Sequence, residues 1–245
     1  MFRGMDVSVH QNLIDWPIVA RAGLDFCIVR GGDGDFVDRN LERNVAGASG
    51  IGLPVDVYHF LRFKEPPSRM AELCLRTYNV ARREGMTGRL WLDLEDDESS
   101  DLTPASCVRW LQEVLFHFSM GVGIYTASWW WRPRMANSKS FGHLSLWTAN
   151  YPYGAVAPPP GFPGPADSPL FPYGGWTNWQ IWQYTSSGSV PGITGRVDLD
   201  VKGQAQGGLP MAKRVIVTIK AGDSHGFAPV AGWHLGIAYR QPIVQ

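Results

Sequence analysis

The chain has 245 residues, and its 22 basic side chains balance its 22 acidic ones, so the formal net charge at pH 7 is zero. Without an overall positive field to attract phosphates, neither nucleic acid nor an anionic membrane surface is an expected partner. The hydrophobic content of 44% supplies a substantial core, enough for one large barrel or two small domains.

Eight short runs of β-branched and aromatic residues predict strands along the chain. They cover residues 5–9, 26–30, 55–60, 90–95, 122–126, 144–149, 179–184 and 197–201. Helical patterns separate several of these runs, and such alternation predicts parallel strands joined by crossovers. Eight strands of this kind suggest a closed barrel.

Three segments between the strand candidates have helical patterns, namely residues 38–49, 68–84 and 104–119. Thr103 is the predicted N-cap of the last one, because a proline follows it at the first helical position. Later connections are rich in proline and glycine, and residues 157–176 read as a long loop. The predicted fold is therefore α/β, an irregular TIM-like barrel with eight strands and fewer than eight helices.

Three cysteines, an odd number, lie inside apolar stretches at Cys27, Cys74 and Cys107. This placement favours reduced core thiols over a disulfide framework and indicates a reducing compartment. The opening segment "MFRGMDVSVHQ" lacks the apolar stretch of a signal peptide, and no run approaches the ~20 apolar residues of a membrane span. Any export is expected to use another route.

Two carboxylates interrupt the apolar run "RLWLDLEDDE" of the fourth predicted strand. Asp93 and Glu95 are two apart, and on a strand such side chains point to one face at about 6.5–7 Å from each other. They also lie near the C-terminal end of the strand, which is the end that carries the active site in a barrel.

Acids recur on the first and last predicted strands, at Asp6 and at Asp198 and Asp200. Because these two strands are neighbours in a closed barrel, acids from three strands converge at one mouth. Crowding raises some carboxyl pKa values and leaves a protonated group that can serve as a general acid. The pattern is that of glycosidase chemistry.

Other interpretations of these acids stay open. An acid at a strand end often caps the next helix or lies on the solvated rim. The carboxylate-rich "DLEDDE" also suits a metal ion, but it lacks an accompanying histidine spacing and the glycine-punctuated pattern of hard-cation loops. Neither a metal nor a cofactor is expected.

Six blocks follow one another in order from residue 4 to about residue 203. They are "GMDVSVHQNLIDW", "VDVYHF", "LWLDLE", "GIYTASWWW", "LWTANY" and "WQIWQYTSSGSVPGITGRVDLDV". Together these blocks resemble glycoside hydrolase family 25, the Chalaropsis-type lysozymes that include many phage endolysins. The resemblance implies an N-acetylmuramidase that cuts the β-1,4 bond between N-acetylmuramic acid and N-acetylglucosamine. Its partner would be bacterial peptidoglycan.

Carried over motif by motif, the resemblance implies that Glu95 is the general acid, with Asp93 as its partner and Asp6 and Asp198 as supporting carboxylates. Further residues would line the sugar groove, namely Tyr58, Tyr125, Trp147, Gln183 and Asp200. For the aromatic residues, packing in the barrel core remains an alternative.

The chain departs from the family's usual wording in places. After the second predicted strand it reads "RGGDG", with Arg30 and Asp33 as the counterparts of a lysine and a glutamate, and it has Asp200 where asparagine is frequent. Residues 204–245 lie beyond the resemblance, and two strand-like runs there predict a short hairpin docked on the barrel, an oligomer contact or a wall-binding arm. The oligomeric state and the host are left open.

Two rival functions remain at this stage. One is a non-catalytic wall-binding protein that keeps the groove. The other is a chitinase-like glycosidase of family 18, whose further acids upstream in the strand are replaced here by Arg89, Leu90 and Trp91. A phage-type endolysin, made in the host cytoplasm and released to the wall, is the expected biological setting. Two acids on one side of the sugar favour substrate-assisted retention over simple inversion.

Overall fold

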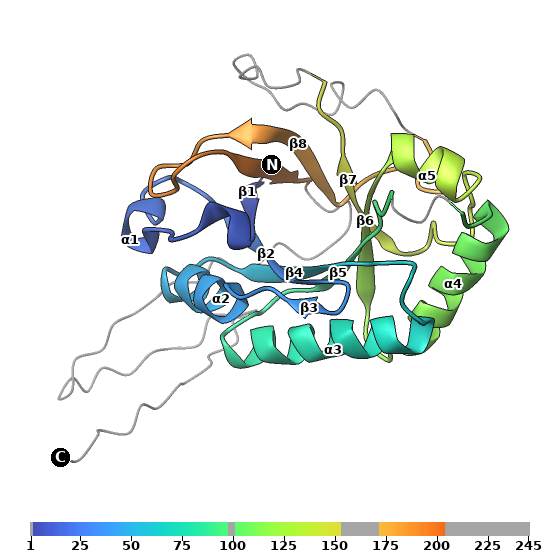
Figure 1. Ribbon diagram of the computed structural model, residues 1–245. Helices are drawn as coiled ribbons and strands as arrows, with labels where there is room; N and C mark the ends of the chain where they lie inside the picture. Colours follow the sequence, from blue (N-terminus) through green and yellow to red (C-terminus); the bar gives the residue numbers. More distant parts are fainter. Residues whose placement is uncertain (1, 98–100, 153–171, 204–245) are drawn as a thin grey trace, which may run out of the picture. The chain divides into compact units, whose positions relative to one another are not determined.

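The computed structural model describes residues 2–97, 101–152 and 172–203 (Figure 1). The prediction for residues 204–245 lies outside these residues, as does most of the loop predicted at 157–176. Both stay predictions.

Eight strands close into a barrel, in the ring order β1-β9-β8-β7-β6-β5-β4-β2, and the β1–β2 pairing completes the ring. A ninth, two-residue strand extends β2 at one edge. The strands are β1 (Phe2–Val7), β2 (Phe26–Asp33), β3 (Phe36–Val37), β4 (Val55–Phe60), β5 (Leu90–Asp93), β6 (Val122–Ala127), β7 (Ser145–Ala149), β8 (Ile181–Gly188) and β9 (Val197–Lys202). All eight predicted strands are present, and the predicted irregular TIM-like barrel is confirmed.

The direction of the last strand corrects the prediction of parallel strands throughout. β9 runs antiparallel to both β1 and β8, whereas the other ring pairings are parallel. Only residues 189–196 join β8 to β9, and a parallel crossover needs a dozen or more residues. Gly192 and Gly195 have φ angles of 94° and 90°, which suit this hairpin connection.

Five α-helices and one 3₁₀ helix occur in the described part of the chain. They are η1 (Val9–Gln11), α1 (Trp16–Val19), α2 (Leu41–Gly50), α3 (Pro67–Arg83), α4 (Pro104–Phe116) and α5 (Ser128–Arg134). The three predicted helices correspond to α2, α3 and α4. The predicted cap is confirmed, because the Thr103 hydroxyl accepts a hydrogen bond from the Ser106 amide at 3.2 Å. Figure 1 shows α2 and α3 packed along the outside of the strands. None of the described helices is long and apolar enough to cross a membrane.

The strands separate two apolar clusters. Outward-facing residues such as Val57, Leu92 and Ile124 pack under the helices, whereas large rings fill the barrel interior, among them Phe26, Trp91 and Trp147. Glycines make room for these rings. A Cβ atom on Gly123 would lie 2.3 Å from the Trp91 ring, and one on Gly4 would lie 2.3 Å from Phe26. The interior is thus a packed core below the mouth.

Candidate active site

Four acids lie at the mouth formed by the carboxyl ends of the parallel strands. Asp6 is the penultimate residue of β1 and Asp93 is the last residue of β5, whereas Glu95 lies beyond the strand. The prediction that both acids of "DLE" lie on the strand is therefore wrong for Glu95. The two carboxyls still interact, since the charge of Glu95 raises the pKa of Asp93.

The antiparallel course of β9 decides the depth of its two acids. In the register between β1 and β9, Asp198 pairs with Asp6, and Asp200 pairs with Gly4. Asp198 consequently lies at the mouth and Asp200 lies deeper in the barrel. In the ring of eight strands β9 is four strands away from β5, so Asp198 faces Asp93 from the opposite wall.

The side-chain amide of Gln183, on β8, connects the acids to two tyrosines. Its Nε2 donates to Asp6 Oδ2 at 2.7 Å and, more weakly, to Asp198 Oδ2 at 3.5 Å. Its Oε1 accepts from the hydroxyls of Tyr125 and Tyr151. Both ends of the buried amide are satisfied, so its orientation is fixed by its neighbours.

The acids of the mouth hold protons more tightly than ordinary carboxyls. Burial raises the pKa of Glu95 to about 7, and the charges of Asp198 and Asp97 add to the effect. Burial also raises the pKa of Asp198 to about 6, although a hydrogen bond with Asp6 opposes the rise. The pKa of Asp6 is raised well above its ordinary value by burial and then by the charges of Asp198 and Asp200.

Asp93 is the most isolated of these acids. Burial raises its pKa well above the ordinary value, the Glu95 charge raises it further, and Arg30 and Arg62 lower it. Its Oδ1 is buried and has no hydrogen-bond partner among the described residues. A buried carboxylate oxygen without a donor is costly, which indicates that its partner arrives with a ligand.

Two arginines near the mouth are held by acids of their own. Arg30 Nε lies 2.8 Å from Asp38 Oδ2. Arg62 bridges Asp33, at 2.7 Å, and Asp96, at 3.2 Å. Arg30 and Asp33 are the residues that depart from the family's usual sequence motif, and they have similar roles in the structure. Each belongs to an ion pair that fixes a cation within range of Asp93.

The predicted groove residues lie at different depths. Tyr58 is half-buried, whereas Tyr125 and Gln183 are buried beside the acids. Trp147 is only 1% exposed, and its ring packs against Tyr58, Tyr125 and Trp91 at centroid distances of 5.7, 4.4 and 6.0 Å. For Trp147 the core alternative describes the structure, and the predicted groove role does not.

Asp200 is also too deep to line a groove. Its side chain is fully buried, Oδ1 accepts from Trp147 Nε1 at 2.8 Å, and Oδ2 has no partner among the described residues. Burial raises its pKa well above the ordinary value. Asp200 therefore lies below the mouth acids as a carboxyl whose raised pKa favours the protonated form and whose Oδ1 accepts from the Trp147 ring.

Tyr151, the last residue of the "LWTANY" block, is not among the predicted groove residues, yet it donates to Gln183. Its aromatic side chain at the end of a quoted block was the available signal. Among the described residues no group of three or more histidine, cysteine, aspartate or glutamate side chains is arranged to hold a metal ion. The site offers a carboxyl that is still partly protonated at neutral pH, a second carboxyl with a buried open oxygen, and two acids on the facing wall.

Comparisons with known proteins find lysozymes among those similar to this chain. The family model of Glycosyl hydrolases family 25 matches residues 5–193. Lysozyme M1 of Streptomyces globisporus is 26% identical over 80% of this chain and 66% of its own length. The autolytic lysozyme of Clostridium acetobutylicum is 24% identical over 81% of the chain and 55% of its own length. The chain thus spans less than two thirds of these two relatives.

A solved structure of a bacterial lysozyme from Streptomyces coelicolor superposes on this chain with a TM-score of 0.67. It shares 22% sequence identity, and the match covers 84% of this chain and 93% of the other. At this identity the likeness establishes the common fold.

Proposed function

The chain belongs to glycosyl hydrolases family 25, and from this premise we propose that it is a peptidoglycan hydrolase. It acts as a lysozyme that cleaves the β-1,4 bond between N-acetylmuramic acid and N-acetylglucosamine in bacterial cell walls. The observation that carries the proposal is the pair of carboxyls at the end of β5, where Glu95 has a pKa of about 7 and Asp93 has an open oxygen.

Glu95 is the general acid. A carboxyl with a pKa near 7 keeps much of its proton at neutral pH and can donate it to the leaving glycosidic oxygen. The burial of the side chain is the main cause of this pKa, and the facing Asp198 is the second. After cleavage the same group, now ionised, can accept a proton from the attacking water.

Asp93 orients the 2-acetamido group of the substrate. Its unpartnered Oδ1 accepts the acetamido N–H, and that bond supplies the donor that the free site lacks. Burial and the charge of Glu95 raise the pKa of Asp93 more than Arg30 and Arg62 lower it, and the oxygen of a carboxyl that carries no proton accepts a hydrogen bond in either protonation state. The acetamido oxygen then attacks the anomeric carbon, which gives substrate-assisted retention.

Asp6 and Asp198 hold the facing wall of the site. The Gln183 amide restrains both carboxyls, and Tyr151, partly exposed beside it, forms part of the sugar groove together with Tyr58. Asp198 is the group that would activate a water across the sugar ring in an inverting enzyme. In the retaining reaction Asp198 instead gives electrostatic support to the site.

We also propose that the protein is made in a host cytoplasm and released to act on the wall, as a phage-type endolysin. Its three cysteines support synthesis in a reducing compartment, because all are buried and free. The proposed partner is bacterial peptidoglycan.

The decisive experiment is mass analysis of purified cell walls after digestion. A new reducing end on N-acetylmuramic acid is expected, and one on N-acetylglucosamine would contradict the assignment. Glu95→Gln is the matched control, since it preserves size and removes the proton. It should lose roughly a hundredfold or more in rate while keeping the fold, and near-normal lysis by this variant would remove Glu95 from the mechanism.

The stereochemical course has its own test. Proton NMR of the first product released from a defined peptidoglycan oligomer should show the β-anomer, as retention requires. An initial α-anomer would assign the nucleophile to a water, with Asp198 or Asp6 as its base.

A further inference from the structure

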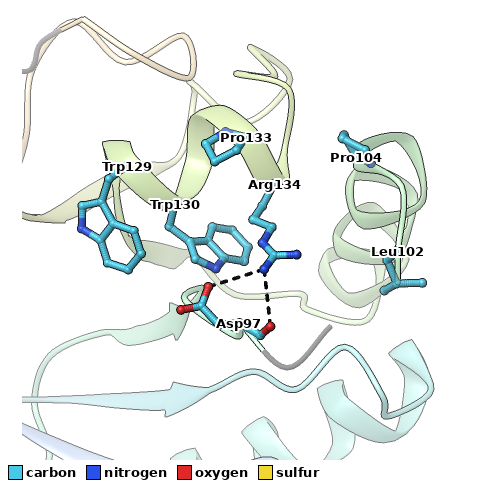
Figure 2. Close-up of a pocket in the computed structure, with 7 residues that line it drawn as sticks. All are labelled: Asp97, Leu102, Pro104, Trp129, Trp130, Pro133 and Arg134. Atoms are coloured by element: carbon cyan, nitrogen blue, oxygen red, sulfur yellow. Dashed lines mark hydrogen bonds and ion pairs between the residues drawn. The ribbon is translucent and has the colours of Figure 1, made fainter. Parts of the chain in front are cut away.

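A pocket of about 430 Å³ lies beside the catalytic mouth and is not used by the proposed reaction. Figure 2 shows its two sides, formed by residues of α5 and by Asp97, Leu102 and Pro104. Asp97, which lines it, lies two residues after Glu95, and its charge raises the pKa of Glu95. One wall of the pocket therefore lies two residues from the proposed general acid.

One nitrogen donor in this pocket is unpartnered, and a second makes only long contacts. Trp130 Nε1 is buried and has no hydrogen-bond partner among the described residues. Arg134 Nη2 donates a 3.4 Å hydrogen bond to the Asp97 backbone oxygen and forms a 3.8 Å ion pair with Asp97 Oδ1. The Trp130 ring is held in place by packing on Phe63, with centroids 6.0 Å apart, so its donor is preorganised.

The remaining walls of the pocket are apolar. Trp129 is 57% exposed, although tryptophan is a costly side chain to leave in water, and Leu102 and Pro104 line the opposite side. Apolar walls with few donors fit a ligand that has small alkyl groups and a carboxylate.

We infer that this pocket, lined by Trp129, Trp130 and Arg134, binds a carboxylate of the peptide stem attached to the wall glycan. The inference rests on the proposed function, because that substrate carries short peptides on alternate sugars next to the scissile bond. Arg134 recognises the carboxylate, Trp130 Nε1 donates to it, and Trp129 covers the alkyl part. Asp97 is 68% exposed at its side chain, so water screens its competition for Arg134.

The test compares two substrates, peptidoglycan with its stems and the same glycan after an amidase has removed them. The measured quantity is the ratio of kcat/KM for the two. Arg134→Met should lower this preference for stems by about tenfold, the value of one charge-assisted hydrogen bond. Trp130→Phe keeps the packing on Phe63 and removes only the donor, and it should lower the preference by about threefold.

Arg132→Met is the matched control, because Arg132 is an exposed arginine on the same helix and does not line the pocket. Its preference ratio should equal that of the unmodified protein. An unchanged ratio in Arg134→Met, or an equal drop in Arg132→Met, would overturn the inference.

A binding measurement separates failure of the pocket from failure of the proposed function. A soluble stem tetrapeptide should shift the indole N–H resonance of Trp130, and the same peptide with amidated carboxyls should not. If the unmodified protein cleaved neither glycan, the proposed function would fail, and this titration alone would decide the pocket. A carboxylate-dependent shift would support it, and the absence of a shift would overturn it.

Discussion

Asp200→Asn should stabilise the protein at neutral pH and weaken the dependence of its stability on pH. In the folded chain the Asp200 carboxyl is fully buried, and its pKa is raised well above the ordinary value. In the unfolded chain it ionises near pH 4. Between these two pKa values the folded state binds one more proton, so stability is present at low pH and is lost as pH rises.

The magnitude follows from proton linkage. A group that keeps its proton only in the folded state costs about 1.4 kcal/mol for each pH unit between its unfolded and folded pKa values. For a chain of this size each such unit corresponds to about 3–6 °C in Tm. Asn keeps the acceptor for Trp147 Nε1, so the substitution removes the titration and retains the contact.

The assay is denaturant unfolding of both proteins at several pH values between 5 and 7. The unmodified protein should lose stability as pH rises. The slope of its unfolding free energy against pH should be shallower in Asp200→Asn, by close to the value for one bound proton. Asp35→Asn, at an exposed acid, is the control and should leave the slope unchanged. Equal slopes for Asp200→Asn and the unmodified protein, with lower stability of the variant at pH 7, would refute the protonated assignment of Asp200.

Three further outcomes are expected. The alkaline limb of the pH profile of kcat/KM should have an apparent pKa near 7, because Glu95 must be protonated. Asp97→Asn should shift this limb to lower pH, since the charge of Asp97 raises the pKa of Glu95. An unshifted limb in this variant would contradict the assignment of the limb to Glu95. Gln183→Ala should reduce kcat by about tenfold or more with little change in KM, because it removes a hydrogen bond that restrains the mouth acids and removes no contact with substrate. An effect on KM alone would assign Gln183 to substrate binding. A thiol titration under denaturing conditions should find three free cysteines, whereas one native disulfide would favour an exported enzyme.

The sequence predicts the strands well because each is a compact apolar run, but it does not predict the direction of β9. The predicted seventh strand ends at Tyr184, which leaves twelve residues before Val197 and makes a crossover look feasible. In the structure β8 continues through the polar residues 185–188, with register shifts against β9. The real connection is a hairpin. Polar residues that pair at bulges do not follow the alternation of apolar and polar residues, so the hydrophobic pattern does not predict that they belong to a strand.

For the site, the sequence identifies the acids but not their depth. An alternation of two residues places Asp198 and Asp200 on the same face, and it cannot state which of them is nearer the mouth until the direction of the strand is known. The same limit applies to Trp147, whose burial depends on Tyr58, Tyr125 and Trp91 from other strands. Contacts across a barrel join residues far apart in the chain, and no local pattern encodes them.

The burial that raises the pKa of Glu95 also makes the site costly at neutral pH. Asp6, Asp93 and Asp200 share this environment, and each is destabilising wherever its unfolded form would release a proton. Only Glu95 and Asp93 use that environment for proton transfer and acetamido binding in the proposed reaction. The destabilisation caused by burying Asp200 can therefore be removed by substitution without changing Glu95 or Asp93. To remove the destabilisation caused by burying Glu95, the general acid itself would have to be replaced. A stabilised Asp200→Asn enzyme that keeps its lytic rate would separate the two roles of burial in this barrel.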